Sequence, residues 1–285
     1  MHQKIFLLAL SSLTLANLAQ AQWSPLASDD FESYTFGEQP GGNWYKLGNN
    51  ASSAANELIT NQTGGTATES GVTLPTNSAG SGNGLYFFDN SATSVSRAAI
   101  NFGDSSQNYD VAYVSFDFSF ATVDAGNTSS YGVIVLTSAD TTALGSTSNQ
   151  ALAINLRYDG SLSWSGGSTS LVNPTASHTL EIVANGGDTN FSYAALDNSG
   201  DTLLSSNTYD LYLDGVRVDS AISFVTDTVA LGRLCLNTYT SAASTGFIMD
   251  NLETYTAVPE PAQYSAVFSS FVLLIGLCMK RIRKS

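Results

Sequence analysis

The feature that most constrains the fold is a strict alternation of apolar and polar side chains in the middle of the chain. Seven consecutive residues carry it: Val114, Ser115, Phe116, Asp117, Phe118, Ser119 and Phe120. Successive side chains of a β-strand point to opposite faces, so three phenylalanine rings fall on one face and polar groups on the other. The pattern predicts a strand of an antiparallel sheet with one buried face.

Two further segments predict β-hairpins. Residues 152–158 repeat the alternation, and Asp159-Gly160 then turns the chain into residues 161–164. Residues 209–213 and 216–219 are joined in the same way by Asp214-Gly215. An Asp-Gly pair between two strand patterns is typical of a two-residue hairpin turn. Both hairpins therefore indicate antiparallel sheet.

Loops rich in glycine and small polar residues separate the strand patterns, as at residues 63–66, 78–84 and 185–188. Glycine supplies positive φ angles there, and short polar side chains satisfy the backbone locally. We find no convincing long helix and no repeat of fixed period, which disfavours a propeller or solenoid. The expected fold is an all-β, antiparallel β-sandwich in one domain of roughly 240 residues, at residues 22–257.

The net charge of this domain and its few cysteine and histidine residues exclude several kinds of partner and site. All 24 acidic residues lie between Asp29 and Glu260, against five of the ten basic residues. Such a surface repels nucleic acid and anionic lipid, and it keeps an exported protein soluble. Cys235 is the lone cysteine of the domain, which excludes an intrachain disulfide. His178 is the single histidine of the domain, which excludes a multi-histidine zinc site.

The two ends of the chain have a different composition from the domain. Residues 1–21 have a basic start at Lys4, an apolar run and small residues up to Ala21, which predicts a secretory signal peptide cut after Ala21. The other end, residues 258–285, carries a Pro-Glu-Pro triplet, an apolar run from Tyr264 to Met279 and a basic cluster. We expect this run to be one transmembrane helix with its basic tail in the cytoplasm.

This last segment resembles the PEP-CTERM sorting signal of Gram-negative bacteria. The resemblance rests on the motif Val258, Pro259, Glu260 and Pro261 and on the basic tail Lys280, Arg281, Arg283 and Lys284. It implies an exosortase partner, a transient inner-membrane anchor with the body outside, and then release to the outer surface or extracellular matrix. The alternative is a plain C-terminal anchor that is never processed.

Several short sequence segments of the domain resemble those of concanavalin A-like, LamG-type jelly rolls. They are residues 29–34 with Gly37 and Trp44 as an opening strand, residues 178–182, residues 209–215, and residues 246–252 as a final strand beside the first. The resemblance implies a jelly roll of a superfamily that holds carbohydrate-binding modules, lectins and glycan-cleaving enzymes. We find no Glu-x-Asp-x-x-Glu triplet of the glucanase type. Asp210, Asp214 and Asp219 are interpreted as a solvated hairpin edge.

Two kinds of candidate site remain. Sugar rings stack on exposed aromatic faces, so Trp44, Trp164 and Tyr212 are candidates, with Tyr113 and Tyr239 beside them; the alternative is that these rings pack the core. The jelly-roll resemblance also implies a structural calcium ion shared by the first and last strands. Asp30, Glu32 and Asp250 could supply its oxygen ligands, or could be exposed or bonded within turns.

Three functions fit these observations. The leading hypothesis is an exported, noncatalytic surface or matrix protein with a lectin-like body that binds extracellular polysaccharide. The second is a glycan-active enzyme of the same fold. The third is a purely structural matrix protein that binds no sugar.

Overall fold

The computed structural model describes residues 22–46, 57–67, 72–89, 95–104, 106–140, 147–227, 229–239 and 246–258. These residues form 19 strands and one short 3-10 turn, Thr147–Asn149, and contain no α-helix. Every strand pair in the two large sheets is antiparallel. The predicted all-β antiparallel fold is therefore confirmed.

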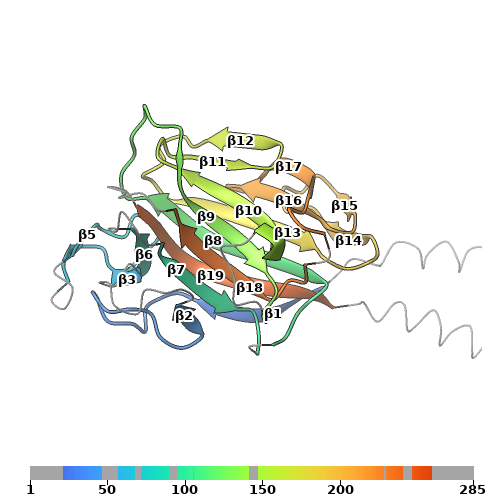
Figure 1. Cartoon of the computed structure of the whole chain (residues 1–285), viewed down its shortest axis with the longest axis horizontal. Coiled ribbons are helices and arrows are strands. Elements are labelled where there is room, and N and C mark those ends of the chain that lie inside the picture. The colour runs from blue at the N-terminus through green and yellow to red at the C-terminus, as the bar shows by residue number, and fades with distance from the viewer. Residues whose placement is uncertain are drawn as a thin grey trace, which may run out of the picture.

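Two large sheets lie one over the other (Figure 1). The larger has the order β17-β16-β13-β8-β19-β6-β3, with β1 also paired to β19. Its strands are β17 (Val216–Ser223), β16 (Thr208–Leu213), β13 (His178–Asn185), β8 (Val111–Phe120), β19 (Gly246–Val258), β6 (Gly84–Phe88), β3 (Glu57–Thr60) and β1 (Gln22–Asp29).

The smaller sheet has the order β12-β11-β10-β9-β18-β7-β2. Its strands are β12 (Gly167–Ser170), β11 (Ser161–Trp164), β10 (Gln150–Arg157), β9 (Ser130–Thr137), β18 (Arg233–Thr238), β7 (Arg97–Asn101) and β2 (Trp44–Lys46). Two small hairpins complete the described chain: β14 (Phe191–Ala194) with β15 (Asp201–Leu204), and β4 (Gly65–Thr66) with β5 (Thr73–Leu74).

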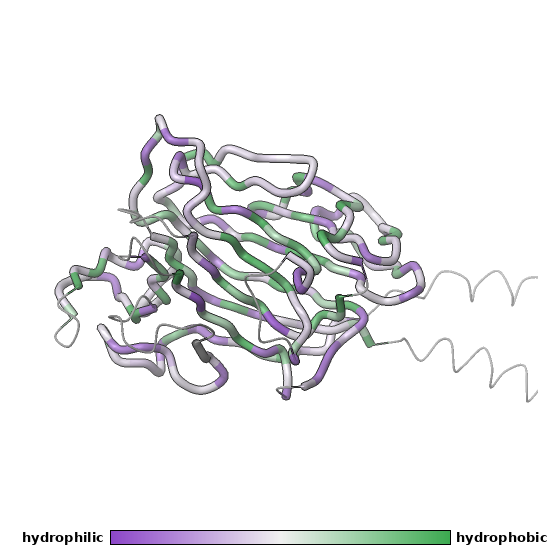
Figure 2. Tube along the Cα trace, viewed as in Figure 1, coloured by the Kyte–Doolittle hydropathy of each residue, from purple (hydrophilic) through white to green (hydrophobic). Residues whose placement is uncertain are grey.

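Phenylalanine rings of β8 lie at the centre of the core between the two sheets. Phe116, Phe118 and Phe120 are fully buried, and each packs against Phe247 of β19 at ring-centroid distances of 5.4 to 6.3 Å. Figure 2 shows the alternation as hydrophobic and hydrophilic segments along the strands. The alternation that predicts this strand thus also builds the core.

The hairpin predictions hold for both Asp-Gly turns. β16 and β17 are joined by Asp214 and Gly215, which have φ angles of 52° and 72°. β10 and β11 are joined through Asp159 and Gly160, the glycine having a φ of 78°. Positive φ at the turn matches the twist of the flanking strands.

The opening strand is placed differently from the prediction. β1 ends at Asp29, and residues 30–38 form turns instead of a strand. The side chains cause this: Asp29 Oδ1 accepts a hydrogen bond from the Phe31 amide, and Asp30 Oδ1 accepts one from the Glu32 amide. Such bonds offer the backbone a turn in place of a sheet partner. Phe31 accordingly has a φ of 59°.

The final strand does return beside the first. β1 pairs with β19 so that Gln22 lies opposite Val258 and Asp29 opposite Leu252. Residues 22–258 therefore hold every described strand and both sheets, with their two ends side by side. The predicted signal peptide, and the sorting segment after Val258, lie outside the described residues. No helix in the described part of the chain is long and apolar enough to cross a membrane.

A candidate binding pocket at the edge of the sandwich

A change of partner along β19 creates the pocket. The first half of β19 pairs with β6, up to Met249 opposite Leu85, and the second half pairs with β1 from Leu252 onward. Between the two halves the register against β8 shifts, and Asn251 has a φ of 49°. A bulge of this kind bends a strand and turns its side chains outward. The chain that follows β1 folds over this point and closes the pocket's other side.

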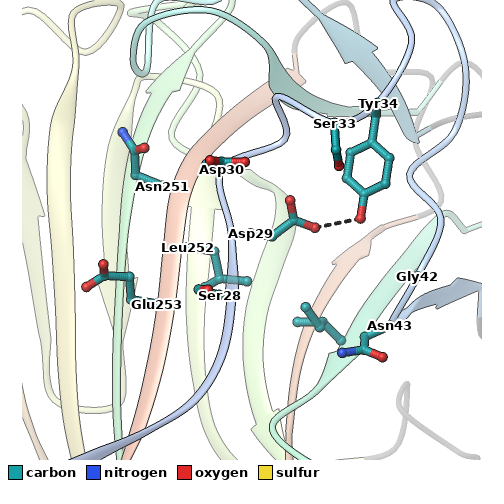
Figure 3. Close-up of a pocket in the computed structure, with 11 residues that line it drawn as sticks. Ser28, Asp29, Asp30, Ser33, Tyr34, Gly42, Asn43, Asn251, Leu252 and Glu253 are labelled. Carbon is teal, nitrogen blue, oxygen red and sulfur yellow. Dashed lines mark hydrogen bonds between the residues drawn. The ribbon is translucent and has the colours of Figure 1, made fainter.

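The resulting pocket has a volume of about 460 Å³. Its walls come from the end of β1, the following turns, Ile100 of β7 and the bulge of β19. The lining residues are Ser28, Asp29, Asp30, Ser33, Tyr34, Gly42, Asn43, Ile100, Asn251, Leu252 and Glu253. In Figure 3, Asn251 and Glu253 lie on one side of β1, and Tyr34 and Asn43 lie on the other.

Asp29 organises one wall of this pocket. Its Oδ2 atom accepts hydrogen bonds from Tyr34 Oη at 2.9 Å and from Trp44 Nε1 at 2.7 Å, and its Oδ1 atom accepts one from the Phe31 amide at 2.8 Å. Burial and the bond to Asp29 raise the pKa of Tyr34, so its hydroxyl stays protonated. Tyr34 is thereby fixed with its ring against the pocket, half buried.

The other polar groups lie open to a ligand. Asp30, Asn43 and Glu253 are exposed, and none of the lining residues is basic. Carboxylates accept hydrogen bonds from hydroxyl groups, and amides both donate and accept. A half-exposed tyrosine ring adds an apolar face. This combination suits a neutral ligand rich in hydroxyl groups and repels an anion.

The three aromatic residues predicted to bind sugar are buried, which makes that prediction wrong. Trp44 and Trp164 are each 7% exposed, and both belong to the main core. Trp164 Nε1 donates to Asp219 Oδ2 at 2.7 Å, as Trp44 does to Asp29. Tyr212 is fully buried under the β14–β15 hairpin. Large rings gain more from burial than from exposure, and each finds a partner for its polar atom.

The two further aromatic candidates lie at the surface. Tyr239 is 41% exposed, and its hydroxyl donates to Asn155 Oδ1 at 2.8 Å. Tyr113 is half buried on the outer face of the larger sheet, between Trp23 and Tyr255. The ring in the pocket, Tyr34, belongs to the opening phrase of the jelly-roll resemblance but was not a predicted binding residue. Its position in the sequence, close to two aspartates and a turn, is the feature from which a binding role could have been predicted.

The prediction of a solvated hairpin edge fits Asp214, whose side chain is 50% exposed in the turn, and is wrong for Asp210. Asp210 is 1% exposed and accepts a hydrogen bond from Tyr193 Oη at 2.6 Å. Asp214 Oδ2 lies 2.8 Å from His178 Nδ1, and Asp219 bonds the indole of Trp164. His178 also faces the carbonyl of Asn173 through Nε2, at 3.2 Å. Asp210 of β16, Asp214 of the turn and Asp219 of β17 thus each bond a side chain of another element.

The three predicted calcium ligands all accept hydrogen bonds from the protein itself. Asp250 is 1% exposed, and its oxygens accept hydrogen bonds from Asn77 Nδ2 and from the Asn251 amide. Glu32 Oε1 accepts one from the Asn83 amide, while Asp30 is exposed at the pocket. Burial, and then the nearby charges of Glu32 and Asp117, raise the pKa of Asp250 to about 6.

Among the residues that the structure describes, no three His, Cys, Asp or Glu side chains are grouped to hold a metal ion. The residues 77–84 instead pack tightly on these carboxylates. A Cβ at Gly80 would collide with Asp250, and one at Gly82 would collide with Glu32. Close approach to the buried Asp250 therefore requires glycine at position 80, whereas Gly82 is favoured by its φ of 79°.

No protein-family model matches the chain, and no curated protein matches it. Solved structures are similar in fold. A carbohydrate esterase of Shiga toxin-encoding bacteriophage phi24B is 12% identical with a TM-score of 0.48, over 83% of this chain and 100% of that one. The Emp47p carbohydrate recognition domain is 10% identical with a TM-score of 0.44, over 85% and 100%.

A third similar structure is the T. cruzi calreticulin globular domain, at 11% identity and a TM-score of 0.43, over 85% of this chain and 92% of that one. At these identities and scores the likeness carries no argument about function. The argument about function therefore rests on the chemistry of the pocket.

Proposed function

We propose that this is an exported, noncatalytic carbohydrate-binding protein of the cell surface or extracellular matrix. The observation that carries the proposal is the pocket between β1 and β19. It presents exposed carboxylate and amide groups beside the ring of Tyr34, and no basic group. Sugar sites combine these elements: polar groups that bond the hydroxyls and an aromatic face for the C–H edges.

The noncatalytic part of the proposal rests on the environment of the carboxylates. Glycoside hydrolysis needs a general acid whose pKa is raised, which an apolar pocket provides. Asp30 and Glu253 are exposed, and Asp29 is bonded by three donors of the protein itself. Asp250 is a buried carboxyl of raised pKa, but Asn77, the Asn251 amide and Gly80 enclose it.

Sorting to the surface is proposed from the C-terminal sequence. Val258 is the last residue of β19, so the Pro-Glu-Pro triplet follows directly on the folded domain. An exosortase would act there with its own nucleophile, and the triplet would serve as the recognition element.

The test is a screen of the purified chain of residues 22–258 on a polysaccharide array, with turnover measured in parallel. We expect saturable binding of at least one neutral polysaccharide, with no release of product. The matched variants are Asp30→Asn with Asn43→Ala in the pocket, and Tyr239→Ala on the smaller sheet. The pocket pair should lose binding, and Tyr239→Ala should keep it. Product release would overturn the noncatalytic proposal, and binding that survives the pocket variants would overturn the assignment of the pocket.

A further inference from the structure

Three aromatic side chains form a continuous strip on the outer face of the larger sheet. The aromatic strip consists of Trp23 of β1, Tyr113 of β8 and Tyr255 of β19. The ring centroids of Trp23 and Tyr113 are 5.4 Å apart, as are those of Tyr113 and Tyr255. All three rings are partly exposed. A sheet face that is exposed to solvent is normally polar, so three neighbouring aromatic rings on it indicate a surface that binds another molecule.

The register of the sheet explains how the strip forms. Tyr255 lies directly opposite Tyr113, while Trp23 lies opposite Ala257. The small Ala257 side chain lets the indole of Trp23 lean across β19 to Tyr113. The strip therefore crosses three strands.

The aromatic strip is continuous with the pocket. Glu253 lines the pocket, and its Oε2 atom accepts a hydrogen bond from Tyr255 Oη at 2.7 Å. At the next strand Tyr113 Oη donates to Glu181 Oε1 at 2.8 Å. Each tyrosine ring thus carries a carboxylate at its edge, which repeats the combination of ring and acceptor found around Tyr34.

The β14–β15 hairpin borders the strip on its other side. Its buried residues, Tyr193 and Leu204, pack on Val183 and Tyr212 of the sheet. Phe191 of the hairpin meets Trp23 at 5.7 Å, edge to face. The hairpin thus covers the neighbouring part of the sheet and meets the strip at Trp23 and Tyr113. Tyr113 and Tyr255 keep part of their surface exposed.

The charges on this face of the sheet favour a neutral ligand over an anionic one. Glu181, Glu253 and Asp117 face this side of the sheet. Arg217 on the same face lies over the ring of Tyr212 and bonds Tyr212 Oη and Thr202 Oγ1. An anionic polymer would meet uncompensated carboxylates, whereas the hydroxyls of a neutral sugar would find acceptors.

We propose that the aromatic strip extends the pocket into a groove-like surface on which several units of one neutral polysaccharide chain bind. This inference rests on the proposed function, since it takes the pocket as the first sugar subsite. The expected ligand is an internal stretch of a polysaccharide chain, which would occupy both the pocket and the aromatic strip. A single terminal sugar would occupy only the pocket.

The test is calorimetric titration of residues 22–258 with cello-, manno- and laminari-oligosaccharides from mono- to hexasaccharide, with oligogalacturonides as the anionic series. Affinity for one neutral series should rise about tenfold with length, equivalent to 1.4 kcal/mol, because two further rings become available. Oligogalacturonides should bind more weakly at every length.

Variants separate the two subsites. Tyr255→Ala with Tyr113→Ala should abolish the gain with length and leave the monosaccharide affinity within twofold. Tyr255→Phe with Tyr113→Phe keeps both rings and should retain most of the gain, which shows that the alanine effect is not a folding defect. Tyr239→Ala is the control on the other sheet. Thermal melts verify that each variant is folded.

The outcomes distinguish the two proposals. Affinity that does not depend on length, or a gain that survives loss of both rings, overturns the aromatic strip and leaves the pocket standing. No binding in any series overturns the proposed function. If length-dependent binding is unchanged in the Asp30→Asn, Asn43→Ala variant, the pocket is not a sugar subsite and the aromatic strip alone is the binding surface.

Discussion

Two tryptophans join the sheets at opposite edges of the sandwich. Trp44 of β2 donates to Asp29 of β1, and Trp164 of β11 donates to Asp219 of β17, both at 2.7 Å. In each pair the ring belongs to the smaller sheet and the carboxylate to the larger one. An indole in such a position fills the core and satisfies its N–H at the boundary with solvent.

The Trp164→Phe substitution tests this structural role. It keeps an aromatic ring in the core but removes the donor to Asp219, which should lower the free energy of unfolding by about 2 kcal/mol. Urea denaturation measures the loss, and glycan titration should show no change. If glycan binding were lost at unchanged stability, Trp164 would be a sugar-binding residue after all.

Trp44→Phe is the matched variant at the other edge. It should cost a similar free energy of unfolding, and it should also weaken glycan binding, because Asp29 loses one of the bonds that hold the wall with Tyr34. Equal effects of both substitutions on glycan binding would contradict the assignment of the pocket.

A third test at the residue scale concerns the proton on Asp250. Its pKa in the folded chain, about 6, exceeds the ordinary value of 3.8, so the folded protein holds this proton more tightly than the unfolded chain does. Stability from this group is fully present below about pH 4 and is lost as pH rises toward about 6. At 1.36 kcal/mol per pKa unit, the loss amounts to about 3 kcal/mol.

Denaturation of the parent and of Asp250→Asn at pH 4 and pH 7 measures the effect, because the other carboxyls cancel in the difference. The stability of the parent relative to the variant should fall as pH rises between these values. A bound calcium ion would lower the pKa of Asp250 and give the opposite slope. The same titration with calcium and with chelator therefore also tests the structural calcium.

At the scale of elements, the β14–β15 hairpin depends on one buried hydrogen-bond network. Tyr193 Oη bonds Asp210 Oδ2 at 2.6 Å and Tyr212 Oη at 2.8 Å, and Asp210 Oδ1 accepts the Ala221 amide. The network fixes the hairpin to β16 and so sets the border of the aromatic strip. Buried networks of this kind hold one arrangement as long as every member is satisfied.

Tyr193→Phe should loosen the hairpin. The substitution leaves the buried Asp210 carboxylate with one donor fewer, at a cost of about 2 kcal/mol. Hydrogen exchange of the β14 and β15 amides should accelerate, while exchange in β8 and β19 follows only the global change. Uniform acceleration in all four strands would mean that the hairpin has no stability of its own.

The sequence predicted elements better than it predicted the site. Alternation at 114–120 and the two Asp-Gly turns depend on local chemistry, and both are present in the structure. The pocket combines residues 28–43 with residues 251–253, and its shape follows from a bulge that no local pattern announces. Alternation also cannot say which face of a strand is covered, which is why the sequence leaves open whether Trp164 and Tyr212 bind sugar or pack the core.

For the whole molecule, the pairing of β1 with β19 brings Gln22 beside Val258. Every strand pair of the two large sheets therefore lies within residues 22–258. If the segment after Val258 is a sorting signal, as we propose, changes in it should leave these strand pairs intact.

Substituting Pro259, Glu260 and Pro261 by alanine tests this separation. The unfolding temperature of the domain should not change, because β19 ends before the triplet. The protein should instead stay in the inner-membrane fraction, since a sorting enzyme could no longer recognise it. Fractionation followed by immunoblotting measures its distribution, with Tyr239→Ala as a control that is sorted normally. If the variant reached the surface as efficiently as the parent, residues 258–285 would be a plain anchor, and the domain would act from the membrane.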